Sequence, residues 1–379
     1  MGHIIRNGGF LLIAAVALLS MGGSALAFKL SPTGTALERQ RARVNSGILG
    51  QWWFKINDFG AVSKFTEPVH EEITHRIFGC DADPEVCGQV EVEYAPMAIL
   101  AGVRWNDDPP FRLSKTSIKA CKIEETIRFI TQPMCWAKLF RHAEATSKSE
   151  YYDFNHSASN MMYRSHFGDL QFLHAMASRE GEKPEETRRR ILMWAEFAWR
   201  VSFAEYKNAD LLRDVRVDGF NSFFGKSGQN VQDLFALGNP ELRKRLNEIA
   251  FGSLLHMVED SFAQGHVARR EPVLDDMCPG SDHPRPGLIQ SFRSYQNQDH
   301  KWHAKYDARP ALASHLVERP NVVAVGRILY AYYEQKASWE AVRPYLECVF
   351  TLDNHSGVAH GEGPAIEARP QGGLAQSTQ

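Results

Sequence analysis

The residues best suited to metal chemistry are His256 and Asp260, which stand four positions apart in a predicted helix. Side chains at that spacing project from the same helix face, one turn apart. Imidazole and carboxylate groups are ordinary zinc ligands, so the pair is able to share or bridge metal ions. Gly265 is expected to end the helix and to let His266 fold back toward the same region. Pairs of this kind also occur on helix surfaces, so one alone does not define a site.

Four further patches carry the same residue types. A second His-x-x-x-Asp arrangement, His303 and Asp307, follows a long loop predicted over 267–299. The other three patches lie upstream: His70-Glu71-Glu72, Trp105-Asn106-Asp107-Asp108 and Ser165-His166-Phe167-Gly168-Asp169. Each patch has an ordinary structural explanation as a cap, a solvated first turn or a core histidine. Together, the five patches predict a cluster of metal ligands.

In order and spacing, these patches resemble the zinc-dependent phospholipase C and single-strand-specific nuclease superfamily, which has a helical fold with a three-metal cluster. The resemblance spans about 70–307 and rests on short motifs separated by insertions. The string 165–169 is similar to the segment around a zinc-ligating histidine in clostridial and bacillary phospholipases. The final pair carries Asp307, as in the nucleases, where the phospholipases usually have Glu.

The resemblance implies two or three zinc ions and a ligand set for each. The first ion would take Asp107, His166, His256 and Asp260. The second would take His266, His303 and Asp307, and the third would use His70 and share Asp260 as a bridge. Asp107 is preferred to Asp108 because Trp-x-Asp matches the nuclease pattern. Asp107 is also the implied catalytic residue, which would orient or deprotonate the nucleophile.

The third ion raises a question about the N-terminus. In the family, the amino group and carbonyl of an N-terminal Trp also chelate this metal, whereas simple signal cleavage here would leave Phe28. Trp52 and Trp53 precede His70 by 18 and 17 residues, so a second cleavage would expose one of them. One hypothesis is therefore that 28–51 is a pro-segment. Otherwise the third site is incomplete, or it is completed by another ligand such as His75.

The implied activity is that of an exported zinc-dependent phosphodiesterase. Metals roughly 3.5–4 Å apart activate a water molecule and hold both the attacking and the leaving oxygen. The 165–169 string and export favour a phospholipase C that cleaves the glycerol-phosphate ester, with a phospholipid head group or membrane surface as partner. The alternatives are a nuclease acting on single-stranded nucleic acid and a non-catalytic, zinc-stabilised binding protein. The net charge of −2 supplies no global attraction for either anionic partner, and no protein partner is evident.

Other metal enzymes fit less well. A di-iron helix bundle needs Glu-x-x-His on two separate helices, but the candidates Glu67/His70 and Glu72/His75 crowd into one segment. A zincin needs His-Glu-x-x-His, and the segment from His70 to His75 has one residue too many.

Hydrophobic periodicity predicts the elements that must position these residues. The chain is expected to be mostly α, a single helical domain of the zinc phospholipase C/nuclease type over 67–350, with long loops and few strands. Helical spacing of apolar residues begins at Pro68 and recurs over 91–104, 122–131, 158–178, 185–206, 229–237, 240–264 and 321–337.

Both ends of the chain differ from this domain. Residues 1–27 have a basic start, a short apolar run and the small-x-small string Ala25-Leu26-Ala27, which predict a signal peptide. The protein is therefore expected to be periplasmic or secreted. Residues 28–66 are interpreted as an N-terminal arm or the pro-segment, and 351–379 as a disordered tail.

The six cysteines agree with export. An even number in an exported chain favours disulfides, but six cysteines allow 15 pairings. Cys80 and Cys87 bracket a short loop, and Cys121 and Cys135 bracket a longer segment. Cys278 and Cys348 remain as a long-range pair, although the sequence alone does not choose among the pairings.

Overall fold

The computed structural model describes residues 34–39, 68–80, 84–88, 94–147, 154, 159–226, 228–296, 303 and 305–361. It is 49% helix and 6% strand, which confirms the predicted mostly helical class. The helices of the first half are α3 (Val69–Ile77), α4 (Pro84–Cys87), α5 (Met97–Val103), α6 (Pro133–Ser147), α7 (Met161–Phe167) and α8 (Pro184–Ser202), with the 3-10 turn η2 (Gln171–His174).

The second half holds the remaining elements. They are η3 (Leu212–Asp214), α9 (Asn221–Phe224), α10 (Val231–Ala236), α11 (Pro240–Arg243), α12 (Leu246–Asp260), β1 (Val267–Arg269), β2 (Ile289–Phe292), α14 (Arg309–His315), α15 (Val322–Glu334) and α16 (Trp339–Val349). The two strands form one antiparallel pair in which Val267 lies opposite Phe292.

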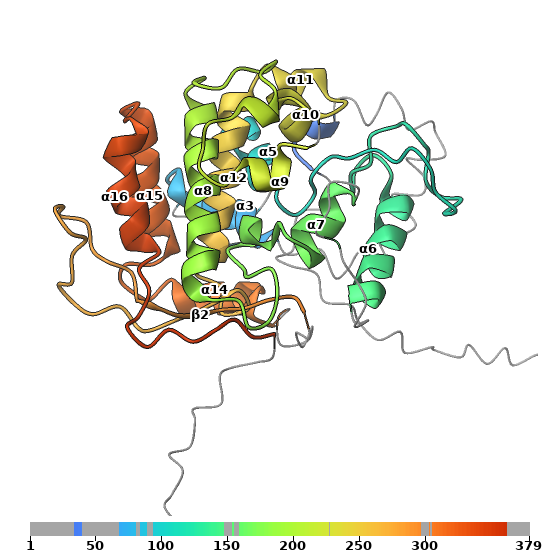
Figure 1. Cartoon of the computed structure of the whole chain (residues 1–379). Coiled ribbons are helices and arrows are strands. Elements are labelled where there is room, and N and C mark those ends of the chain that lie inside the picture. The colour runs from blue at the N-terminus through green and yellow to red at the C-terminus, as the bar shows by residue number, and fades with distance from the viewer. Residues whose placement is uncertain are drawn as a thin grey trace, which may run out of the picture.

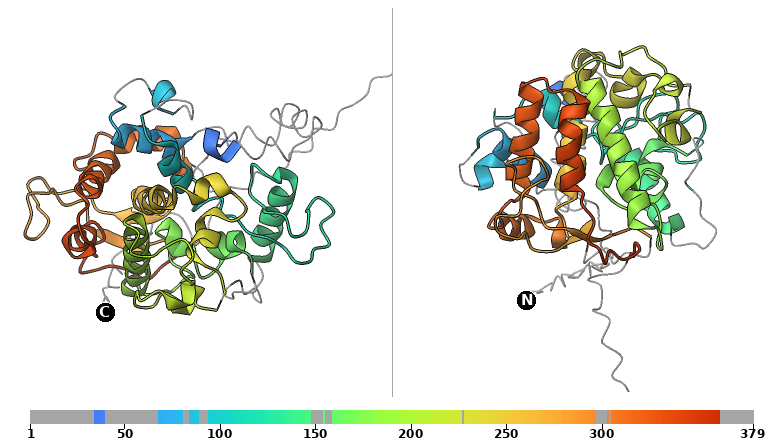
Figure 2. Two further views of the ribbon diagram at one scale, coloured as in Figure 1. Left: turned by 90° about the horizontal axis from the view of Figure 1, so that it is seen from above. Right: turned by 60° about the vertical axis from the view of Figure 1, so that its left-hand side comes forward.

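Helix α12 lies at the centre of the molecule. Every residue from Ile249 to Asp260 is buried, as expected for a helix that is apolar around nearly its whole circumference. The helix contacts α5, α8, α3 and α15. Seen from above, it is inside the molecule, with α8 on one side and α15 and α16 on another (Figure 2). Polar groups at its C-terminal end are therefore buried by the surrounding helices.

Helix α5 crosses α12 at very short range, and two glycines allow the approach. A Cβ on Gly102 would lie 2.2 Å from the Ile249 carbonyl oxygen, and one on Gly252 would lie 2.1 Å from the Ile99 carbonyl oxygen. Any larger residue at either position would push the helices apart. This crossing fixes the segment that follows α5, which contains Asp107, relative to the C-terminal half of α12.

Helix α8 packs beside α12 and illustrates how the predicted helices form. Pro184 occupies the first turn, and Glu185 and Glu186 place negative charge at the positive end of the helix dipole. The inward face buries Trp194, whose indole N–H donates a hydrogen bond to the Ser253 hydroxyl of α12 over 3.2 Å. Helix α8 lies beside α12 in the fold (Figure 1), and its bounds lie close to the predicted range 185–206.

The structure corrects several local predictions. Residues 122–131 are not helical: Glu124 has a φ of 62°, and Ile127 pairs with Phe111 in an extended bridge. Isoleucines spaced by three and four residues imitate a helical stripe there, although Ile123 is exposed. Helices α6 and α16 were not predicted, and β1 and β2 lie within the predicted 267–299 loop. The predicted helix 240–264 is broken into α11 and α12.

All six cysteines form disulfides, as predicted. The pairs are Cys80–Cys87, Cys121–Cys135 and Cys278–Cys348. Three disulfides indicate an oxidising, periplasmic or extracellular environment. In the described part of the chain, none of the helices combines the length and the apolar character that spanning a membrane requires.

The described part of the N-terminal arm, 34–39, packs into the domain. Thr35 and Glu38 form a reciprocal capping box: the Thr35 N–H donates to Glu38 over 2.7 Å, and the Glu38 N–H donates to the Thr35 hydroxyl over 3.2 Å. Glu38 is buried and pairs with Arg104 at 2.9 Å and Arg128 at 2.8 Å. These six residues are thus held in place rather than mobile.

The other predictions for the two ends fall largely outside the described residues. The signal peptide at 1–27, Phe28, and the pair Trp52 and Trp53 lie there, so the pro-segment hypothesis stays a prediction. The described stretch 354–361 runs beside β2, and Arg293 forms a parallel bridge with His360. The rest of the predicted disordered tail, 362–379, also lies outside the described residues.

Candidate metal centre

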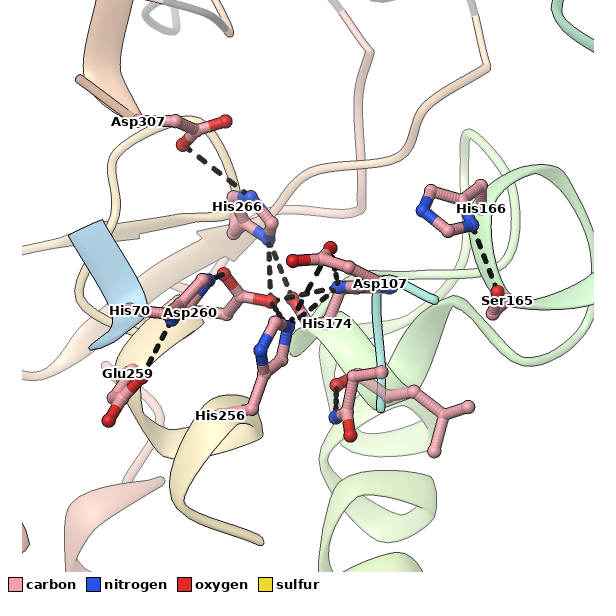
Figure 3. Close-up of polar contacts among 12 residues, drawn as sticks. His70, Asp107, Ser165, His166, His174, His256, Glu259, Asp260, His266 and Asp307 are labelled. Carbon is pink, nitrogen blue, oxygen red and sulfur yellow. Dashed lines mark hydrogen bonds and ion pairs between the residues drawn. The ribbon is translucent and has the colours of Figure 1, made fainter. Parts of the chain in front are cut away.

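Three buried groups of His and Asp side chains gather around the C-terminal end of α12, and Figure 3 labels all of their members except His303. The first group contains Asp107, His174 and His256, and the second contains His70, His256 and Asp260. The third contains His266, His303 and Asp307. Within each group, the candidate ligand atoms lie within 4.8 Å of one another.

The first group and the adjoining Asp260 have spacings suited to a shared ion. Asp260 Oδ2 lies 2.9 Å from His174 Nδ1 and 2.9 Å from His256 Nε2, and these two nitrogens are 3.1 Å apart. Ligands at zinc–nitrogen distances of roughly 2.0–2.1 Å and tetrahedral angles are about 3.3 Å apart. Asp107 Oδ1 is 3.7 Å from His174 Nδ1 and 4.0 Å from His256 Nε2. These donor atoms therefore fit a tetrahedral cation.

Asp260 joins the first group to the second. Its Oδ2 faces His174 and His256, while its Oδ1 lies 3.2 Å from His70 Nε2. The His70 and His256 rings stack with their centroids 4.0 Å apart. Asp260 thus has one oxygen in each group, the arrangement required of the bridge that the sequence prediction assigned to it. Metal binding itself stays a prediction.

The third group is built by the turn after α12 and by the segment that carries His303 and Asp307. His303 Nε2 lies 2.7 Å from Asp307 Oδ2, and His266 Nε2 lies 3.6 Å from Asp307 Oδ1. A Cβ at Gly265 would lie 3.1 Å from both Asp307 Oδ1 and His303 Nδ1. The prediction that Gly265 ends the helix is wrong, because α12 ends at Asp260, but Gly265 leaves room for the neighbouring ligand side chains.

Hydrogen bonds orient the rings from outside the groups. The His70 Nδ1–H donates to Glu259 Oε2 over 2.7 Å, and the Thr74 hydroxyl donates to Glu259 Oε1 over 2.9 Å. The His266 Nδ1–H donates to the His174 carbonyl over 2.8 Å. Such bonds fix the tautomer and direct the lone pair of Nε2 into the cluster, as is usual for metal-binding histidines.

The charges of the cluster also favour a cation. Among the described residues, Asp107, Asp260 and Asp307 form ion pairs with histidines and with no lysine or arginine. Both oxygens of Asp107 and of Asp307 are buried without a hydrogen bond from the described residues. Buried charges are normally paired or bound to metal. Neutral imidazoles with carboxylates are a donor set that suits zinc.

The pKa shifts reflect this crowding of carboxylates. Burial raises the pKa of the Asp107 carboxyl well above its usual value. Burial also acts to raise the pKa of Asp260, but the nearby imidazoles of His266 and His256 outweigh it and hold that pKa well below its usual range. Burial lowers the pKa of His256 to about 3. Burial also acts to lower the pKa of His70 and that of His266, but the nearby carboxylates outweigh it, raising the pKa of His70 and raising that of His266 to about 9. A bound cation would supply positive charge that lets the carboxylates ionise beside neutral histidines.

His166 lies outside the three groups. His174 occupies the position beside Asp107 and His256 that the sequence prediction assigned to His166. The His166 Nδ1 lies 3.1 Å from the Met162 carbonyl oxygen and 2.9 Å from the Ser165 hydroxyl, and the ring is displaced from the cluster (Figure 3). Its ring centroid is 5.0 Å from that of His174. The 3-10 turn η2 carries His174 inward eight residues later. No motif drew attention to His174, because apolar residues surround it in the sequence.

The structure also distinguishes Asp107 from Asp108 and shows whether His75 joins the candidate ligands. Asp107 belongs to the first group, whereas Asp108 pairs with Arg128 at 3.1 Å and accepts the Phe129 N–H over 2.8 Å. His75 belongs to none of the three groups, and its Nδ1 accepts the Ala95 N–H over 3.2 Å. The structure thus separates Asp107 from Asp108 and leaves His75 outside the candidate ligand groups.

A tyrosine side chain lies between the first and third groups. The Tyr295 ring centroid is 5.0 Å from that of His303, 6.2 Å from that of His266 and 6.4 Å from that of His174. Burial raises the pKa of its hydroxyl well above the usual value, and the carboxylates of Asp307 and Asp260 add to the effect. The hydroxyl therefore keeps its proton.

Comparison of the chain with protein-family models, with curated proteins and with solved structures gives no match. The three linked His/Asp groups are therefore the basis for assigning a function.

Proposed function

We propose that the protein is an exported zinc-dependent phosphodiesterase with the fold of the phospholipase C and nuclease superfamily. The observation that carries the proposal is the sharing of residues between groups: His256 and Asp260 each face two of the candidate ion positions. A purely structural zinc site usually closes on four protein ligands and stands alone. Linked groups that share a histidine and a carboxylate are better suited to holding a phosphate between cations.

Zinc ions bound there would lower the pKa of a water molecule and polarise the phosphate oxygens. The chain supplies the remaining functions. Asp107 is 6% exposed, and neither of its oxygens accepts a hydrogen bond from the described residues, so one oxygen is available to take the proton of the attacking water. Glu259 and the His174 carbonyl hold the rings of His70 and His266 in one orientation. Such fixed orientation removes reorganisation from the barrier.

A phospholipid is the favoured substrate. The segment between β1 and β2 projects from the body of the protein beside α15 and α16 (Figure 1). At its start, Val273 is 69% exposed and Leu274 is 82% exposed, and Val317 elsewhere is 77% exposed. Exposed apolar side chains on a disulfide-anchored loop suit contact with a lipid surface, which a nuclease does not require. The Asp at 307 keeps the nuclease as the second candidate.

The test compares the purified protein with Asp260→Asn. Zinc per chain is measured first, and the same samples are then assayed on phosphatidylcholine vesicles and on single-stranded DNA. Asp353→Asn is the control, because Asp353 is also buried and pairs with Arg270 away from the cluster. We expect two or three zinc ions and phosphatidylcholine hydrolysis in the wild type and in the control, and loss of both in Asp260→Asn.

The outcomes separate the candidates. Hydrolysis of DNA alone would assign the nuclease instead. Zinc without activity on either substrate would support a zinc-stabilised binding protein. A protein that takes up no zinc when zinc is resupplied would refute the metal centre.

A further inference from the structure

The hydroxyl of Tyr295 is a buried polar group that the cluster of ligands does not use. The residue is 6% exposed, and no described residue forms a hydrogen bond with its hydroxyl. A phenylalanine would fill the same space without burying an unpaired donor, which is unfavourable. The hydroxyl is therefore unexplained by packing alone, and its surroundings indicate what it contacts.

The backbone around Tyr295 is tied to both sides of the metal centre. The Tyr295 N–H donates to the Gln171 side-chain oxygen over 2.9 Å, and Gln171 lies in η2 with His174. Two residues earlier, the Arg293 N–H donates to the His266 carbonyl over 2.8 Å. The position of Tyr295 is thus fixed relative to one ligand of the first group and one ligand of the third.

The ring lies among aromatic and imidazole groups from these two sides. On the first side are Phe167, with its centroid at 5.9 Å, and His174, at 6.4 Å. On the other side are His266, at 6.2 Å, and His303, at 5.0 Å. A phosphate held between the first and third groups would lie beside this ring.

On the basis of the proposed phosphodiesterase function, we propose that the Tyr295 hydroxyl donates a hydrogen bond to a non-bridging oxygen of the substrate phosphoryl group. Tyr295 is then a catalytic residue that touches the substrate and is not a ligand. A fixed, water-excluded donor stabilises the charge that develops on this oxygen as the water attacks, and it has no rearrangement to undergo at that moment. The hydroxyl stays protonated throughout.

The test uses zinc-loaded full-length protein, as wild type, Tyr295→Phe and Tyr345→Phe. Tyr345 is a matched control because it is 2% exposed and its hydroxyl also lacks a hydrogen bond from the described residues. Its ring lies against His283, with centroids 5.1 Å apart, and not against the metal centre. Zinc content, thermal unfolding, hydrolysis of bis(p-nitrophenyl) phosphate and calorimetric binding of inorganic phosphate are measured on each.

In Tyr295→Phe, we expect unchanged zinc content and folding, kcat reduced about 10²- to 10³-fold, and KM little changed. The Kd for inorganic phosphate should rise by about tenfold or more, since a hydrogen bond to a charged group is lost. Tyr345→Phe should match the wild type in all four measurements.

Two results would overturn the proposal. Loss of zinc from Tyr295→Phe would make the tyrosine a ligand, and unchanged kcat and phosphate binding beside an active wild type would leave it without a role. If the wild type binds zinc and phosphate but hydrolyses no phosphodiester, the proposed function fails. Phosphate binding by the variant then still decides whether the hydroxyl contacts the anion.

Discussion

Two clusters of buried charge lie next to each other in this protein and are built differently. In the first, which we name the arginine network, Glu38, Glu71 and Asp108 each lie within 3.1 Å of Arg104 or Arg128. In the metal centre, Asp107, Asp260 and Asp307 meet imidazoles and, among the described residues, no arginine or lysine. The network supplies its own counter-charge, whereas the metal centre fits charge brought by cations.

The two clusters meet in one short segment after α5. Arg104 and Asp108 belong to the arginine network, and Asp107 between them faces the metal centre. The network therefore fixes the backbone from which Asp107 projects. We therefore expect removal of metal to affect the metal centre, and loss of a side-chain partner to affect the arginine network.

The largest expected effect is that of metal removal. At free zinc about 1,000-fold above the dissociation constant, each bound ion adds about 4 kcal/mol to the free energy of unfolding. Exhaustive chelation should therefore lower the melting temperature strongly and abolish hydrolysis, and added zinc should restore both. Calorimetry with and without chelator checks this, and Asp260→Asn should respond much less. An unchanged melting temperature after zinc is removed would mean that the ligands are satisfied without metal.

The next largest effect should come from Glu38→Gln, which removes the carboxylate shared by two buried guanidinium groups and leaves Arg104 with Glu71 and Arg128 with Asp108. Removing one partner of a buried ion pair typically costs about 3–5 kcal/mol. Urea unfolding of chelator-treated protein measures the loss. Excess zinc should not rescue the variant, because the lost charge belongs to the arginine network. Rescue by zinc would show that the two clusters share their counter-charge.

The ion pairs of Glu38 with Arg104 and Arg128 also make the stability of the fold depend on pH. Burial acts to raise the pKa of Glu38, but the positive charges of Arg104 and Arg128 have the larger effect and hold that pKa below 4.5. A carboxyl group whose pKa is lower in the folded than in the unfolded state stabilises the fold above pH 4.5, and this contribution is lost as the pH falls below that value. Asp108 gives the opposite pH dependence of stability, because burial raises its pKa in the folded state to about 6. The difference between wild type and Glu38→Gln should therefore shrink as the pH falls below 4.5, as measured by urea unfolding of apo-protein.

A smaller effect is expected from Glu259→Gln, which weakens the hydrogen bond that orients His70. Loss of such an orienting carboxylate typically lowers metal affinity by about 10- to 100-fold. Competition with a chromophoric chelator measures this affinity. Glu347→Gln is the control, because Glu347 forms a solvent-exposed pair with Arg343 on α16. Equal zinc affinity in Glu259→Gln and the control would remove Glu259 from the metal centre.

The sequence predicted the grouping of the candidate metal ligands better than it predicted the arginine network. His256 and Asp260 are close in sequence and share one helix face, so their spacing carried most of the information. Glu38 meets Arg104 across 66 residues, and no local pattern reports such a contact. His174 was missed for a similar reason, because a 3-10 turn with its own backbone geometry brings it into the cluster. Motifs record local geometry, and long-range pairing depends on the fold.

The smallest effect should come from Thr35→Ala, which removes the hydroxyl of the capping box and leaves Glu38 in place. Loss of a Ser or Thr cap costs about 1 kcal/mol. The Thr35 N–H still donates to Glu38 Oε2, so the pairs with Arg104 and Arg128 should survive. Urea unfolding should show this small loss, while zinc affinity and hydrolysis stay unchanged. If hydrolysis also falls, the segment 34–39 acts on Asp107 through the arginine network, and the two clusters form one functional unit.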